Sequence, residues 1–135
     1  MASVNADLDR TMADQASGAE SYVAALESMI IGFVRFCADH PAAMRAFRAI
    51  ADGARSGKAR QLNEHNRQAG LAELESMFEE GQREGEYRAF ATPPMAVALM
   101  AALAATPAEL AHTQDADAYG RELAAIFAHA TRPEQ

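Results

Sequence analysis

Few residues in this chain have the type and spacing that catalysis or metal binding requires. Glu109 and His112 stand three residues apart, as in the Glu-x-x-His pairs of di-iron helix bundles. Such a centre needs two of these pairs and further carboxylates on facing helices, whereas this chain has one pair. We therefore interpret Glu109 as part of a capping box that begins at Thr106 and His112 as an exposed histidine, and we expect no metal site.

The single cysteine, Cys37, makes no stronger case for an active site. It lies in a strongly apolar stretch with Arg35 as the nearest positive charge, and a thiol becomes a good nucleophile only where its pKa is lowered. The sequence has no Gly-x-Ser-x-Gly motif and no phosphate-binding glycine loop. We interpret Cys37 as a small buried hydrophobe, and we expect neither enzymatic activity nor a cofactor.

Charged and polar residues are numerous but do not converge. The six glutamates in the range 73–86 are scattered around a helix, which is typical of a solvated face rather than of a catalytic carboxylate pair. The five basic residues in the range 45–60 could hold an anion, but their spread over two helix faces favours ordinary surface. His65 and Asn66 lie among polar residues, where each could be surface or a polar contact inside a pocket.

The most informative set consists of aromatic and methionine side chains. Methionine adapts to irregular space and is favoured at promiscuous apolar sites, so a small bundle rich in it can hold a pocket between its helices. The plainer alternative is that the same side chains simply fill the core. The set comprises Tyr22, Met29, Phe33, Phe36, Met44, Phe47, Met77, Phe78 and Met100.

Composition limits the fold and the partners. The chain has 135 residues, half of them apolar, which is enough for one domain with a modest core. Alanine occurs 33 times and valine and isoleucine four times each, which predicts an all-α fold. The net charge of −7 argues against a nucleic-acid-binding surface, and the single cysteine excludes an internal disulfide. No apolar run approaches the roughly 20 residues of a membrane span, so we expect a cytoplasmic protein.

Hydrophobic periodicity predicts an antiparallel bundle of about five to six helices. A polar segment, 1–17, precedes a single domain, 18–132. The first strong helix is apolar nearly all round from Met29 onward, so we expect it at the centre of the fold. The expected helices are 19–39, 41–54, 58–84, 93–105, a short one restarted at Thr106, and 115–130.

Glycine, proline and threonine mark the expected ends of these helices. Thr92 is expected to cap the helix that begins at Pro93, because threonine suits the cap position and proline the first turn. Gly85 is expected to end the long third helix. Gly70, in the middle of that helix, indicates a kink or a close contact.

Two stretches and the order of the helices carry a family resemblance. One is Phe33-Val-Arg-Phe-Cys-Ala-Asp-His-Pro41, followed by Met44-Arg-Ala-Phe47. The other is Gly81-Gln-Arg-Glu-Gly85-Glu-Tyr-Arg88, followed by Thr92-Pro-Pro and an Ala-rich helix. Over residues 18–130 the chain resembles the C-terminal ligand-binding and dimerisation domain of TetR family transcriptional regulators. Residues 1–18 cannot hold that family's helix-turn-helix domain, so we expect no direct binding of nucleic acid by these residues.

The resemblance implies a homodimer that binds a small apolar or aromatic effector. It pairs the helices 93–105 and 115–130 with their copies, through Leu99, Met100, Leu103, Tyr119, Leu123, Ile126 and Phe127. Inward-facing positions of the earlier helices give the expected ligand contacts Met29, Phe33, Phe36, Cys37, Phe47, His65 and Met77, with Asn66 as a further polar candidate. The alternative is a dimeric α-helical interaction module that has no ligand pocket and is close-packed.

Overall fold

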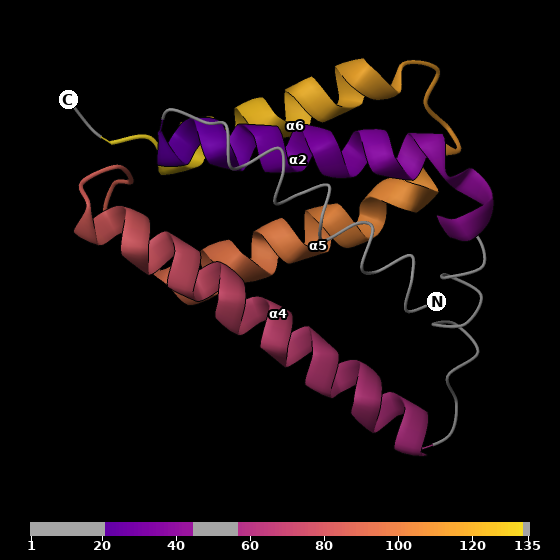
Figure 1. Cartoon of the computed structure of the whole chain (residues 1–135), viewed down its shortest axis with the longest axis horizontal. Helices are drawn as coiled ribbons and strands as arrows, with labels where there is room; N and C mark the ends of the chain where they lie inside the picture. Colours follow the sequence, from indigo (N-terminus) through magenta and orange to yellow (C-terminus); the bar gives the residue numbers. More distant parts are fainter. Residues whose placement is uncertain (1–20, 45–56, 134–135) are drawn as a thin grey trace.

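The computed structural model describes residues 21–44 and 57–133 (Figure 1). Within these ranges helix is the only regular secondary structure, which confirms the all-α fold class. The helices are α2 (Tyr22–Asp39), α4 (Gly57–Arg83), α5 (Thr92–Leu110) and α6 (Ala116–Thr131), with one further helical turn at 41–44. The expected segment 1–17 and the rest of the expected helix 41–54 lie outside the described residues.

The central helix is α2, as its all-round apolar sequence predicts. It packs most extensively against α6 and also against α5, and it lies between these two helices in Figure 1. Leu26, Ile30 and Val34 are spaced four residues apart, so they lie along one side of the helix, and all three are fully buried. Gly120 of α6 allows the close approach, because a Cβ atom there would lie 3.3 Å from the Cβ atom of Val34.

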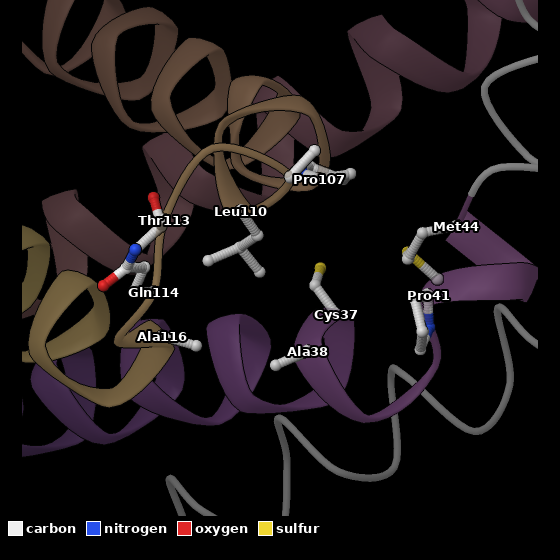
Figure 2. A pocket seen from close by; sticks show the side chains of 10 residues that line it. Cys37, Ala38, Pro41, Met44, Pro107, Leu110, Thr113, Gln114 and Ala116 are labelled. Carbon is white, nitrogen blue, oxygen red and sulfur yellow. The ribbon is translucent and has the colours of Figure 1, made fainter.

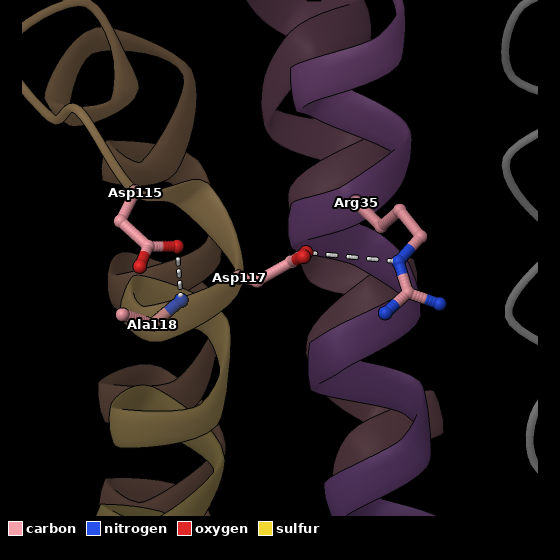
Figure 3. Close-up of polar contacts among 4 residues, drawn as sticks. All are labelled: Arg35, Asp115, Asp117 and Ala118. Atoms are coloured by element: carbon pink, nitrogen blue, oxygen red, sulfur yellow. Dashed lines mark hydrogen bonds and ion pairs between the residues drawn. The ribbon is translucent and has the colours of Figure 1, made fainter.

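Side-chain caps fix the starts of α2 and α6. The hydroxyl oxygen of Ser21 accepts a hydrogen bond from the backbone N–H of Ala24 at 3.0 Å. The carboxylate of Asp115 does the same for the N–H of Ala118 at 3.0 Å (Figure 3). Arg35 and Asp117 form an ion pair of 3.8 Å between the two helices, but both side chains are more than half exposed and the pair contributes little stability.

A turn that contains Gly85 ends α4 and leads into α5. Gly85 adopts a φ of 75°, in the left-handed region that favours glycine, so its expected role at the helix end is confirmed. The carbonyl of Gly81 accepts hydrogen bonds from the N–H groups of Glu86 and Tyr87 at 2.8 and 3.1 Å. The ring of Tyr87 lies directly against Gly81, where a Cβ atom would overlap it.

The start of α5 differs from the sequence expectation. Thr92 is the first helical residue rather than the cap, and its hydroxyl donates a hydrogen bond of 3.5 Å to the carboxylate of Glu79 on α4. The cap position belongs to Ala91, which makes no side-chain capping bond. The threonine is buried and ties α5 to α4 instead of capping its own helix.

The restart expected at Thr106 is also wrong, because α5 continues through Pro107 to Leu110. The side chain of Thr106 is fully buried, and its hydroxyl donates to the carbonyl of Ala102, one turn earlier, at 2.9 Å. This back-bonding satisfies the hydroxyl without a cap. Pro107 has no backbone N–H, so the carbonyl of Leu103 has no helical donor four residues later.

By length and composition alone, α5 could cross a membrane. It has 19 residues and a window with mean hydropathy 1.3, so the expectation that no apolar run approaches that length is wrong. Many alanines, each only weakly apolar, combine with leucine, valine and methionine in a long stretch that has no charge before Glu109. One such helix is weak evidence for a span, and Ala96 and Leu99 anchor α5 in the core of the bundle.

The main core is built from all four helices and the turn after α4. Tyr87 is buried there, with its ring edge-on to Phe78 and Tyr22 at centroid distances of 5.7 and 6.0 Å. Its hydroxyl donates to the carbonyl of Tyr22 at 2.9 Å, which offsets the cost of burying it. The cluster comprises Leu26, Ile30, Phe78, Tyr87, Ala96, Leu99, Ala124 and Phe127.

Candidate ligand cavity

A second, smaller buried cluster lies at the other end of α2, where the chain makes an elbow. It consists of Phe36, Cys37 and Met44. The backbone N–H of His40 donates to the carbonyl of Phe36 at 3.1 Å, and its Nδ1 lies 2.9 Å from the same oxygen. The ring of His40 stacks on that of Phe36 at 4.2 Å, and the N–H of Met44 donates to the carbonyl of His40 at 3.0 Å. These contacts fix the elbow.

The connection between α5 and α6 faces this elbow and is held just as firmly. The hydroxyl of Thr113 donates to the carbonyl of Glu109 at 2.8 Å, and its N–H donates to the carbonyl of Leu110 at 3.2 Å. Asp115 then caps α6. The turn is therefore ordered by hydrogen bonds within the chain.

A cavity of about 360 Å³ lies between the elbow and the turn. Leu110 and Cys37 occupy its middle, Met44 lies toward one end, and Thr113 and Gln114 lie at the other (Figure 2). The volume falls at the lower end of the range for small-molecule pockets, roughly 300–1,000 Å³. The lining residues are Cys37, Ala38, Pro41, Met44, Pro107, Leu110, Ala111, Thr113, Gln114 and Ala116.

The thiol of Cys37 is part of the apolar wall. The residue is only 3% exposed, and burial raises the pKa of its thiol to about 11. The thiol therefore stays protonated at neutral pH and is a weak nucleophile. The interpretation of Cys37 as a small buried hydrophobe is confirmed.

The structure does not gather the expected ligand contacts in one place. Cys37 lines the cavity, Phe36 lies beside it in the same cluster, and Phe33 packs against that cluster. Met29 and Met77 pack against the main core instead.

The polar candidates also lie away from the cavity. His65 and Asn66 are exposed on the first half of α4, and Phe47 lies outside the described residues. Sequence reasoning missed Leu110 and Gln114, because the expected restart at Thr106 placed them on a short surface segment. A helical stripe was available as a signal: Leu99, Leu103, Thr106 and Leu110 follow one another at spacings of four, three and four residues.

The expected dimer contacts differ in how far the chain itself buries them. Leu99 and Phe127 lie in the main core, at 0% and 6% exposure, whereas Ile126 is 55% exposed. The remaining four are partly buried, namely Met100, Leu103, Tyr119 and Leu123.

The acidic and histidine side chains form no metal-binding group in the part of the chain that the structure describes. No group of three or more His, Cys, Asp or Glu side chains there could hold a metal ion. Glu109 and His112 are both exposed, and the capping role expected for Glu109 is wrong because no helix begins at Thr106. Glu80 and Glu86 instead accept hydrogen bonds from the hydroxyl and the N–H of Tyr22.

Comparison with known proteins adds no identification. No protein-family model matches the chain, and no curated protein or solved structure matches it either. The resemblance to TetR regulators stays a prediction that rests on the residues of this chain.

Proposed function

We propose that this chain is a ligand-sensing and homodimerising regulatory domain of the TetR type, which binds a small apolar or aromatic effector and does not itself contact DNA. The observation that carries the proposal is the outer face of α5. Thr92–Leu110 contains no charged residue before Glu109, yet only 17% of its apolar window is buried. An apolar face of this length usually marks an interaction surface.

The exposed positions of α5 have helical spacing and small side chains. Pro94, Val97, Ala98, Ala101 and Ala105 follow one another at intervals of three, one, three and four residues, which puts them on one side of the helix. Small side chains allow a second helix to approach closely. A copy of α5 would fit this surface without polar groups to desolvate.

Two of the large exposed apolar side chains belong to the helices that the resemblance pairs in a dimer. The large exposed apolar side chains among the described residues are Leu62, Val97 and Ile126, at 60%, 44% and 55% exposure. Val97 belongs to α5 and Ile126 to α6, the two helices that the resemblance pairs in a dimer. A two-fold contact through either helix buries the exposed side chain of that helix in both copies.

The cavity favours a ligand-sensing domain over a dimeric interaction module without a pocket. A module of that kind has no need of an opening of about 360 Å³ at the end of its bundle. In a regulator, a ligand that binds one arrangement of the dimer better than another shifts the population between them.

Native mass spectrometry of the purified chain tests the dimer. We expect a particle of about 29 kDa, twice the 14.5 kDa of one chain. Ile126→Glu should give monomer, because it places a charge in the apolar contact of both copies. Leu62→Glu is the matched control: Leu62 is as exposed as Ile126 but lies on α4, so this variant should remain dimeric.

Either of two results contradicts the dimer. One is a wild-type monomer at micromolar concentration. The other is an equal effect of the two substitutions in folded protein, with folding checked by circular dichroism.

A further inference from the structure

The cavity is formed by segments that the chain already holds in place. The elbow after α2 and the turn before α6 are both closed by backbone hydrogen bonds, and Asp115 caps the helix that follows. Binding of a molecule between them therefore costs little conformational entropy, because the site is already ordered. Ala38, Pro41 and Gln114 are exposed at the margins of the cavity, which leaves it open to entry from solvent.

The side chains that line the cavity favour a neutral ligand over a charged one. None of the ten lining side chains carries a charge, and eight of them are apolar. An ion bound there would lose hydration without gaining an opposite charge, and this is costly. The middle, with Leu110 and Cys37, and the end at Met44 suit an apolar body, and methionine can adapt its shape to that body (Figure 2).

The two polar side chains of the lining, Thr113 and Gln114, lie at one end of the cavity (Figure 2). The hydroxyl of Thr113 already donates its hydrogen bond to the carbonyl of Glu109. Gln114 also lines this end and has both donors and an acceptor on its side-chain amide. A ligand with one neutral polar group can thus be oriented by this amide.

We propose that this cavity binds a small neutral molecule with an apolar body and a single hydrogen-bonding group, such as an aromatic alcohol. The apolar body lies against Leu110, Cys37 and Met44, and the polar group lies beside Gln114. The inference rests on the ligand-sensing part of the proposed function and gives that part a site and a ligand class.

The test is a titration with benzyl alcohol, followed by NMR of the methionine methyl groups. The methyl signal of Met44 should shift and saturate, whereas that of Met77, which packs against the main core, should stay in place. Benzoate, which has the same ring and a negative charge, should leave the Met44 signal unmoved. Equal binding of benzoate, or no shift of Met44 up to the solubility limit of benzyl alcohol, overturns the proposal.

Two substitutions locate the site and its polar end. Ala116→Leu fills the cavity and should weaken benzyl alcohol at least ~5-fold, as overpacking does. Ala72→Leu, at an exposed position of α4, is the control and should have no effect. Gln114→Leu should weaken benzyl alcohol by ~3- to 10-fold, the worth of one hydrogen bond, and leave toluene unaffected. Unchanged affinity in Ala116→Leu, or equal losses for both probes in Gln114→Leu, refutes the site.

The native mass of the same samples separates this inference from the dimer. If the protein is a monomer and still shows the saturable Met44 shift, the result supports the cavity site and contradicts the proposed dimer. If the protein is a dimer and shows no shift of Met44, the result supports the dimer and overturns the cavity site.

Discussion

Replacing Gly81 by alanine should destabilise the protein more than any other glycine-to-alanine change in α4. The new methyl group would overlap the Cδ2 and Cε2 atoms of the Tyr87 ring, so the ring or the helix must move. The ring has little room, because it is only 4% exposed and meets Phe78 edge-on at 5.7 Å. Its hydroxyl is also bound to the carbonyl of Tyr22 at 2.9 Å.

The expected loss follows from three contributions. Overpacking costs about 1–3 kcal/mol, and weakening the Tyr87 hydrogen bond costs about 1 kcal/mol. Alanine gains about 0.5–1 kcal/mol over glycine inside a helix. The net loss is therefore about 2 kcal/mol. With an unfolding entropy of about 2.1 cal/mol/K per residue, this loss lowers the Tm of a 135-residue chain by roughly 7 °C.

Urea unfolding followed by circular dichroism measures this loss, with Gly57→Ala as the matched control. Gly57 is on the same helix, and a Cβ atom there would meet nothing within 4 Å. This variant should be as stable as the wild type or slightly more so. All samples are compared at one protein concentration, because dimerisation would shift the apparent stability. Equal unfolding midpoints for the two variants would refute the packing argument.

Four further experiments have defined outcomes. Iodoacetamide should label Cys37 at pH 8 about 100-fold more slowly in the folded than in the urea-unfolded chain, because its pKa of about 11 instead of 9.0 lowers the thiolate fraction by two decades. Since folding raises this pKa, the free energy of unfolding should fall as pH rises from 9 to 11. Arg88→Met should cost about 1–2 kcal/mol in urea unfolding, because it removes the 2.7 Å bond to the carbonyl of Ala130 and the cation above Phe90. Ile126→Ala should raise the dimer Kd about 30-fold in sedimentation, since each copy loses about 1 kcal/mol of burial; an unchanged Kd would place Ile126 outside the interface.

Much of the fold could be predicted because its signals are local. The spacing of Leu26, Ile30 and Val34 defines a helix face whatever lies opposite it, and Gly85 ends α4 through its own backbone conformation. Gly70 indicated a close contact, and the structure has one: a Cβ atom there would lie 2.8 Å from the terminal methyl of Met100.

The candidate site could not be predicted in the same way, because it depends on which segments meet in space. Periodicity shows that Met29 and Met77 face inward but not that they fill the main core. The error at Thr106 has a specific cause: its pattern matches a capping box, yet burial lets its hydroxyl bond to the preceding turn of the helix. That error hid the continuation of the stripe to Leu110, and with it one wall of the cavity.

The way α4 leaves the bundle has a consequence for how the protein opens locally. The helix diverges from the other three toward its N-terminal end (Figure 1). In the range 57–69, all residues whose exposure the structure describes are exposed to solvent. Gly70, the next residue, lies against Met100 of α5. An isolated helix of such a length is marginal in water, whereas the stretch from Leu71 to Gly81 shares the core. Backbone amides in one continuous helix should therefore exchange with solvent in two regimes: the outer turns by local fraying at small free-energy cost, and the inner turns only when the core itself opens.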